Sequence, residues 1–396
     1  MSERTLARTT AAAVLALVAA LLQALVAPAA QAQEPVLPTP TGPHPVGSAV
    51  LHLVDEARAD PWKPDRRREL MVTVWYPARD VAGRPRAPYT GAESALGYPF
   101  GGLPLAGATG NSYAGAPVDD SLGAVPTVLF SPGYGTARDL YSVMAEELAS
   151  RGFAVVTMDH TFETPAVAFP GGRVEYADPA VLGDESMVDV RVADSRFVLD
   201  DLSRIVAGEN PDAEHAGLPA GLARALDLDR VGMFGHSYGG YTAVETMRVD
   251  ARIDAVVDLD GAIGSDDEPV PAVTEGMDRP VLLMASGATY RSRGGGPVTW
   301  DPTWGPFLSN HRGWVRALAL LDSGHFSYSD LPVFIPLAAA VLPSIRDAAG
   351  VGSAERAIAV QREYVPAMFD RFLRDRDGAL LDGPTPRFPD VLFWTR

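Results

Sequence analysis

The chain of 396 residues contains no cysteine. This absence excludes disulfide bridges, thiolate nucleophiles, and zinc or iron–sulfur sites built on cysteine. Basic residues are also scarce, with 33 Lys and Arg against 50 Asp and Glu and a net charge of −17. Because such a chain repels phosphate backbones, we expect no nucleic-acid partner. With 21% charged and 47% hydrophobic residues, the composition is that of a globular protein.

Long apolar runs are rare, and the one near the N-terminus is short for a membrane span. This run, Ala11 to Val26, follows Arg4 and Arg8 and precedes the small-residue pattern Ala30-Gln31-Ala32. The order is typical of a secretory signal peptide. We therefore expect residues 1–32 to be cleaved near Ala32 and the mature protein to be secreted, without stable membrane insertion.

The rest of the chain predicts one domain, residues 48–396, after a Pro/Gly-rich tail over residues 33–47. Two early apolar runs predict an antiparallel strand pair, and residues 87–125, rich in Gly, Pro and Ala, predict a long irregular insertion. From residue 126 onward, near-continuous apolar strands alternate with helical patterns, which predicts a mostly parallel sheet covered on both faces. The expected strands are Ala49 to Val54, Leu70 to Tyr76, Pro126 to Phe130, Phe153 to Met158, Val231 to Phe234, Ala255 to Leu259, Val281 to Ala285 and Ala317 to Leu321. The expected helices include one marked by Val188, Val192, Val198, Leu199, Leu202 and Ile205, one over Tyr238 to Val249, and one over about Ala354 to Leu373.

A candidate nucleophile lies where one of these strands meets a helix. The strand Val231 to Phe234 runs into Gly235-His236-Ser237-Tyr238-Gly239, which is a G-x-S-x-G pattern between a strand and a helix. Such a turn holds the serine in a strained conformation above the sheet edge, and its glycines avoid collisions with the neighbouring turn. We therefore predict that Ser237 is a nucleophile.

A serine nucleophile needs a general base, and His325 is the best candidate. It follows the last predicted parallel strand, in the sequence Asp322-Ser323-Gly324-His325, and lies after the serine in the chain, as the base does in this architecture. His160 precedes the serine, so we interpret it as lining the pocket or as hydrogen-bonded and structural. His236 lies inside the turn and is expected to point away from Ser237.

The acid that orients the base is expected between Ser237 and His325. The strand Ala255 to Leu259 carries Asp258 and is followed by Asp260, and the strand after it leads into no carboxylate. Asp260 is preferred because it lies at the tip of its strand, from which it can reach the histidine. Asp258 and Asp322 remain open as alternatives.

Acyl transfer also needs backbone amides that bind the oxyanion. One is expected from Tyr238, the residue after the nucleophile. The second is expected from the loop Ser131-Pro132-Gly133-Tyr134-Gly135, whose glycines allow close approach to a substrate, and the amide of Tyr134 is our choice.

These motifs together resemble the platelet-activating factor acetylhydrolase family of α/β-hydrolases, in its secreted bacterial branch. The resemblance is carried by Val74-Trp75-Tyr76-Pro77-Ala78, Phe130 to Gly135, Phe153 to His160, the Gly-His-Ser-Tyr-Gly-Gly turn, Leu259-Asp260-Gly261 and Gly324-His325. It implies an α/β-hydrolase fold, an acid at Asp260 and oxyanion amides at Tyr134 and Tyr238. Ser131-Pro132 departs from animal members, which carry Ser-His there. Secreted bacterial lipases and polyester hydrolases have similar turns.

The function predicted is a secreted serine carboxylic ester hydrolase that acts on short-acyl or lipid-like esters, with no metal and no organic cofactor. The alternatives are a polyester hydrolase or triacylglycerol lipase, an amidase or peptidase on the same scaffold, and a non-catalytic binding protein. Tyr134, His160, His236 and Phe326 are candidates to line the pocket. The apolar segment from Phe326 to Leu337 predicts either an acyl pocket or core packing.

Overall fold

The computed structural model describes residues 37–91, 94, 105–181, 184, 187–265, 269–292, 301–338, 353–376 and 378–394. The expected signal peptide lies outside these residues. Among the residues described, no helix has the length and hydropathy needed to cross a bilayer.

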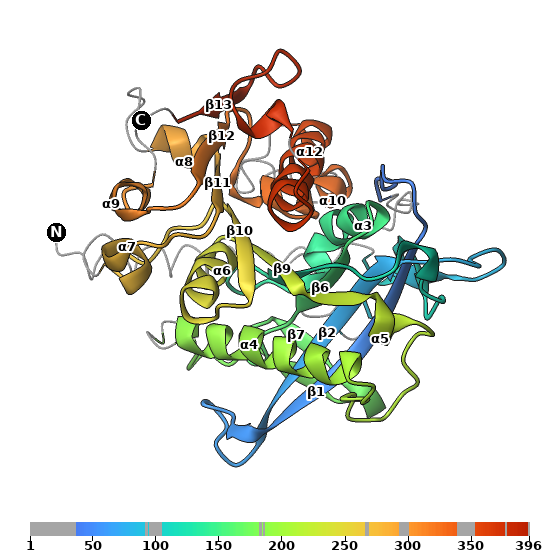
Figure 1. Cartoon of the computed structure of the whole chain (residues 1–396). Coiled ribbons are helices and arrows are strands. Elements are labelled where there is room, and N and C mark those ends of the chain that lie inside the picture. The colour runs from blue at the N-terminus through green and yellow to red at the C-terminus, as the bar shows by residue number, and fades with distance from the viewer. Residues whose placement is uncertain are drawn as a thin grey trace.

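A single sheet of eleven strands, ordered β13-β12-β11-β10-β9-β5-β6-β2-β1-β4-β3, forms the centre of the molecule (Figure 1). The six strands from β12 to β6 are parallel to one another, and β2 and β13 join them antiparallel at either side. The strand bounds are β1 Val46–Ala59, β2 Arg67–Pro77, β3 Arg86–Pro88, β4 Thr109–Ala114, β5 Val125–Ser131, β6 Ala154–Met158, β9 Leu226–His236, β10 Ile253–Leu259, β11 Val281–Ser286, β12 Val315–Leu320 and β13 Val391–Phe393. β7 Ala166–Ala168 and β8 Val174–Tyr176 form a separate hairpin. The prediction of a mostly parallel sheet is confirmed, and the arrangement is that of an α/β-hydrolase.

Helices cover both faces of the sheet, as expected for apolar parallel strands (Figure 1). On one face lie α4 and α6, and on the other lie α3 and α12. Successive residues of one strand point to opposite faces, so that Val156 packs with the first pair of helices and Val155 with the second. The helix bounds are α3 Ser142–Ser150, α4 Met187–Val206, α5 Leu222–Ala225, α6 Tyr238–Val249, α7 Pro271–Glu275, α8 Gly287–Ser292, α9 Trp304–Asn310, α10 Leu331–Ala338 and α12 Ala354–Leu373. Short 3-10 turns lie at η1 Leu105–Gly107, η2 Asp120–Leu122, η3 Arg138–Tyr141, η4 Pro170–Gly172, η5 His325–Tyr328 and η6 Ala379–Leu381.

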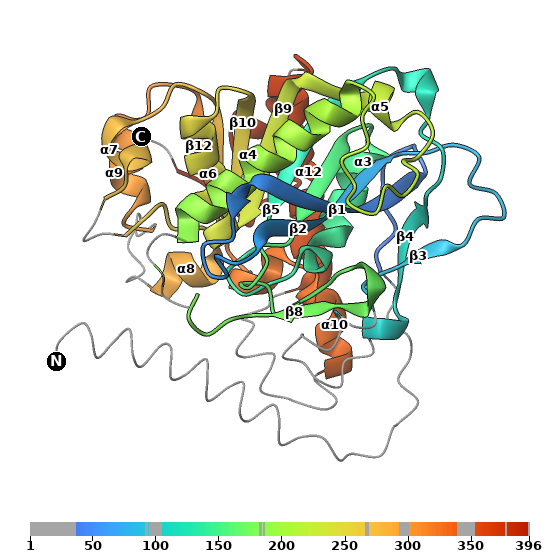
Figure 2. The ribbon, with the colours of Figure 1, turned by 90° about the horizontal axis from the view of Figure 1, so that it is seen from below.

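Two segments expected to be irregular are more ordered than the sequence indicated. Within residues 87–125, β4 pairs with β1 and β3 pairs with β4, so this part of the predicted insertion extends the main sheet (Figure 2). In the predicted tail, Thr41 hydrogen-bonds Glu147 and His44 donates its amide to Ser150, which fastens the segment to α3. These segments lie at an edge and at the surface, where hydrogen bonds to neighbouring elements help to hold them, so they lack the regular apolar period of the central strands.

The segment from Phe326 to Leu337 also lies partly in the core. Tyr328, Leu331 and Phe334 are buried, whereas Phe326 and Val333 are half-buried. Core packing therefore accounts for the first three of these residues. Phe326, directly after His325, borders the candidate site, and its ring centroid lies 5.4 Å from that of His325.

Candidate active site

The turn between β9 and α6 holds Ser237 in a strained backbone conformation. Ser237 has φ 56° and ψ −124°, a region that residues with a side chain rarely adopt. Its N–H donates to the carbonyl of Leu259 at 2.8 Å, and its carbonyl accepts from the N–H of Gly240 at 2.9 Å. Strand β10 and the first turn of α6 therefore fix the partly exposed serine at the carboxyl edge of the sheet.

Three glycines allow the backbone to close around this turn. A Cβ built on Gly235 would overlap the carbonyl of Gly239, and one built on Gly239 would overlap the carbonyl of Ser131. A Cβ on Gly240 would overlap the carboxyl of Asp258. The glycines that the motif supplies thus bring the serine turn against both the loop after β5 and the end of β10.

Asp260 and His325, which were predicted from separate loops, are in direct contact. The Nδ1 atom of His325 lies 2.7 Å from Oδ2 of Asp260, which also accepts from the hydroxyl of Thr289 at 3.2 Å. The amide of Ser286 donates to Oδ1 at 2.7 Å. Burial alone would raise the pKa of Asp260, but the hydrogen bonds and charge of His325 and the donors of Ser286 lower it below its ordinary value. The carboxylate is therefore ionised and has no proton to give, so Nδ1 of His325 donates and Nε2 keeps a free lone pair.

His236 connects the loop of the base to the serine turn. Its Nε2 donates to the carbonyl of His325 at 2.8 Å, and its Nδ1 accepts from the hydroxyl of Tyr141 at 2.9 Å. Burial and the neighbouring imidazole of His325 lower the pKa of His236 to about 3, so the ring is neutral and this tautomer satisfies both nitrogens. The residue that precedes Ser237 thus holds the backbone of the candidate base.

The two alternative acids lie elsewhere. Asp258 is buried under the turn, where its Oδ1 accepts from the amide of Gly261 at 2.9 Å. Burial raises its pKa well above the ordinary value, which makes it a neutral group rather than a charged partner for a histidine. Asp322 is exposed in the turn before His325. Of the three carboxyls, the structure brings Asp260 to the imidazole.

The amides of Tyr134 and Tyr238 are both suited to bind an oxyanion. Tyr134 is the second residue of a β-turn, in which the amide of Thr136 donates to the carbonyl of Gly133 at 3.1 Å. The amide of the second residue of a β-turn has no acceptor within the turn. Tyr238 begins α6, and the first amides of a helix lack an intrahelical acceptor. In the part of the chain that the structure describes, neither of these two amides donates to a backbone carbonyl of another segment.

The four pocket candidates fall into two groups. Tyr134 is 41% exposed, its ring lies edge-on to that of Tyr238 at 6.4 Å between centroids, and Phe326 is half-buried beside His325. His160 and His236 are each only 1% exposed. Both nitrogens of each ring are engaged in buried hydrogen bonds, which agrees with the hydrogen-bonded, structural role given as the alternative for His160.

Sequence reasoning missed a buried polar network beside the site. It consists of Arg68, His160, Glu163, Arg191 and Asp194, all of them 1% exposed or less. Its one signal in the sequence was the position of Arg191 and Asp194 within the apolar pattern of a long helix. Among the residues that the structure describes, no group of three or more His, Asp and Glu side chains is arranged to hold a metal ion.

Comparison with known proteins gives consistent relatives. Residues 29–170 match the family model described as platelet-activating factor acetylhydrolase, isoform II. The probable 1-alkyl-2-acetylglycerophosphocholine esterase of Arthroderma benhamiae is 30% identical over 392 residues, which cover 90% of this chain and 93% of that protein. The platelet-activating factor acetylhydrolase of Cavia porcellus is 27% identical over 155 residues, 34% of each chain. Among solved structures, the ferulic acid esterase from Streptomyces cinnamoneus is 37% identical with a TM-score of 0.75, covering 92% of this chain and 100% of that one.

Proposed function

The chain belongs to the platelet-activating factor acetylhydrolase-like family and is a carboxylic ester hydrolase, and we propose that it is a secreted serine esterase whose catalytic residues are Ser237, His325 and Asp260. Nε2 of His325 removes the proton of the Ser237 hydroxyl as the oxygen attacks the ester carbonyl. The amides of Tyr134 and Tyr238 bind the oxyanion, and Asp260 stabilises the imidazolium. The imidazolium then protonates the leaving alcohol, and a water molecule activated by His325 cleaves the acyl-enzyme.

The observation that carries this proposal is the position of His325. Its Nδ1 is held by Asp260 at 2.7 Å, and its carbonyl is held by His236, the residue directly before Ser237, at 2.8 Å. These two contacts leave Nε2 as the free basic atom beside the serine turn. An imidazole fixed in this way has the tautomer that a general base requires.

Labelling with a fluorophosphonate probe tests the assignment of the nucleophile. Wild-type protein is expected to be labelled on one serine and to lose its esterase activity in step with labelling. Ser237→Ala should abolish both, whereas Ser309→Ala, a change of an exposed serine on α9, should alter neither. Full esterase activity in Ser237→Ala would refute the proposal.

For the substrate, we propose an ester with a short acyl group on a lipid-like alcohol. The names of the fungal and animal relatives support this class. An ester of an aromatic acid is the second candidate, since the bacterial ferulic acid esterase is 37% identical and tyrosine rings flank the serine turn. The ratio of kcat/KM for a 2-acetyl glycerophospholipid to that for methyl ferulate decides between them, and a ratio below one favours the aromatic acid.

Export is proposed from the N-terminal sequence alone. When the full chain is expressed in a bacterium with a general secretion pathway, the protein in the medium is expected to begin at Gln33. An intact N-terminus on protein retained in the cells would contradict the proposed localisation.

A further inference from the structure

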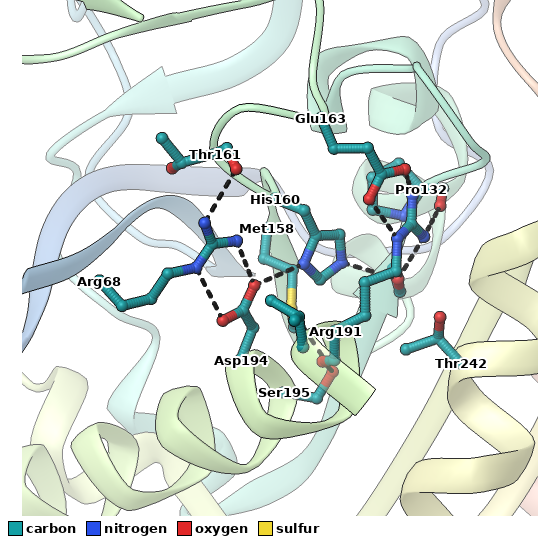
Figure 3. A network of polar contacts seen from close by, with 12 residues as sticks. Arg68, Pro132, Met158, His160, Thr161, Glu163, Arg191, Asp194, Ser195 and Thr242 are labelled. Carbon is teal, nitrogen blue, oxygen red and sulfur yellow. Dashed lines mark hydrogen bonds and ion pairs between the residues drawn. The ribbon is translucent and has the colours of Figure 1, made fainter. Parts of the chain in front are cut away.

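A buried guanidinium contacts the loop that carries the amide of Tyr134. Arg191, in the second turn of α4, is 1% exposed, and its Nη1 donates to the carbonyl of Pro132 at 2.6 Å and to the hydroxyl of Ser131 at 3.3 Å. Its Nη2 donates to the carbonyl of Gly133 at 3.3 Å. Figure 3 shows the guanidinium lying against this loop at Pro132. One side chain therefore contacts three successive residues of the loop.

Glu163 fixes the orientation of this guanidinium. The Nε of Arg191 donates to Oε2 of Glu163 at 2.7 Å, and Nη2 pairs with Oε1, so the contact is bidentate (Figure 3). Oε1 also accepts from the amide of Gly135 at 3.4 Å. Both Arg191 and Glu163 therefore contact the loop. A lysine could supply the charge of Arg191 but not the planar set of donors that these contacts use.

The contacts to the carbonyl of Gly133, one of them from Arg191, set the direction of the Tyr134 amide. In a trans peptide the carbonyl of one residue and the N–H of the next point in opposite directions. The carbonyl of Gly133 is directed at Arg191 and also accepts from the amide and hydroxyl of Thr136. The N–H of Tyr134 is therefore turned away from these groups, out of the buried network.

The same guanidinium also contacts the residue that supplies the second oxyanion amide. It lies over the ring of Tyr238 at 5.1 Å from the centroid, within the range of a cation–π interaction. Arg191 thus contacts both Tyr238 and the turn that holds Tyr134, which come from segments about a hundred residues apart in the chain.

His160 and Asp194 hold the loop from a second direction. Burial favours the neutral carboxyl of Asp194, but Arg68 keeps the pKa of this group well below its ordinary value, so Asp194 accepts from Nδ1 of His160 at 2.9 Å. Burial and the nearby charge of Arg191 lower the pKa of His160, whose neutral ring then accepts at Nε2 a hydrogen bond from the hydroxyl of Ser131, 2.9 Å away. The free lone pairs of Ser131 face Arg191, so each donor in this chain of contacts meets an acceptor.

We propose that Arg191, oriented by Glu163, is a positioning residue that aligns the amides of Tyr134 and Tyr238 for the oxyanion. The proposal rests on the proposed serine esterase function. Arg191 contacts neither substrate nor reacting atoms in this scheme and acts through the two amides. Its loss should weaken binding of the tetrahedral state while leaving binding of the ester nearly unchanged.

The test compares Arg191→Lys with a matched variant, Arg374→Lys. Arg374 is also nearly buried, pairs with Asp370, donates to the carbonyls of Arg151 and Gly152, and lies over the ring of Phe153 at 3.6 Å. Like Arg191, it combines a carboxylate partner, backbone carbonyls and an aromatic ring, but on the side of α12 and away from the serine turn. The two variants therefore lose interactions of the same kinds at different places.

The readouts are kcat and KM for p-nitrophenyl acetate per titrated serine, and the inhibition constant of a trifluoromethyl ketone that forms a tetrahedral adduct. For Arg191→Lys we expect kcat to fall about 100-fold, near the loss seen when one oxyanion donor is removed, with KM little changed. The inhibition constant should rise by the same factor. Arg374→Lys should change neither quantity, because Arg374 lies away from the serine turn. Any partial unfolding of a variant lowers the number of titrated serines and leaves the rate at each serine unchanged.

An unchanged kcat per site and inhibition constant in Arg191→Lys would overturn the proposal. If that variant does not fold, Glu163→Gln decides, because it keeps the size of the side chain and removes the charge that orients Arg191. A parallel change of kcat and inhibition constant in Glu163→Gln supports the proposal, and a change in neither overturns it. Activity that survives in Ser237→Ala would instead refute the esterase mechanism itself, so the two failures are distinguishable.

Discussion

Replacing Asp260 by asparagine changes the tautomer of the candidate base. Oδ1 of the carboxylate accepts from the amide of Ser286, while Oδ2 accepts from Nδ1 of His325 and the hydroxyl of Thr289. In Asp260→Asn, the amide oxygen must stay at Ser286, because the NH₂ group would otherwise face another donor there. The NH₂ group then points at His325, whose proton has to move from Nδ1 to Nε2. In that tautomer Nε2 has no lone pair to accept the proton of the serine.

The size of the effect follows from this change. A triad that loses its acid in this way drops in kcat by about 10⁴-fold in the well-studied serine protease template. At 1.36 kcal/mol for each factor of ten, that is about 5.5 kcal/mol of transition-state stabilisation. We expect the full loss here, since the amide of Ser286 fixes which way the new side chain faces. The side chain of Asp260 is buried, so bulk water does not reach this position to replace the lost acceptor.

The assay is kcat for p-nitrophenyl acetate at pH 7.5, with Asp258→Asn as the matched control. Asp258 lies two residues earlier and is buried, and its raised pKa makes it already neutral, so asparagine closely reproduces it. The oxygen of the new amide can still accept from Gly261. We expect Asp258→Asn to retain its activity. A variant Asp260→Asn that keeps more than a tenth of wild-type kcat, or a control that falls as far, would refute the reasoning.

Three further outcomes follow from the structure. Gly239→Ala should lower both activity and melting temperature, measured by esterase assay and calorimetry, because the new Cβ would overlap the carbonyl of Ser131. Burial raises the pKa of Asp330 to about 7, so the folded state keeps a proton that the unfolded chain releases above about pH 4, and stability should fall as pH rises from 4 to 7. Urea midpoints at pH 5 and pH 8 should show that Asp330→Asn reduces this fall, and an equal dependence in both proteins would contradict it. Arg68→Met should cost roughly 3 kcal/mol in the free energy of unfolding, because it removes the bidentate partner of the buried carboxylate of Asp194, and a loss near zero in chemical denaturation would show that the pair contributes nothing.

Much of the fold could be predicted because local patterns determined it. The helices Tyr238–Val249 and Ala354–Leu373 have the bounds that the sequence indicated, and the central strands are apolar because both of their faces are buried. The candidate site was predictable for the same reason, since its residues come directly after strands whose carboxyl ends share one edge. By contrast, β4 and β13 were missed because they are short strands at or near the edges, whose partners are distant in the chain.

The network around Arg191 shows why the rest of the site could not be predicted from the sequence. Val188 and Val192 marked the buried face of α4 in the sequence, yet both are only half-buried, and the helix buries Arg191 and Asp194 in its first turns instead. A charged side chain is buried when a partner neutralises it, and a helical pattern carries no information about partners outside the helix. Here the partner of Arg191 lies 28 residues away, and Arg68, which pairs with Asp194, lies 126 residues away. Two such charges inside an apolar stripe are therefore themselves a signal that the helix reaches a polar site. In this chain that site is the loop that presents the amide of Tyr134.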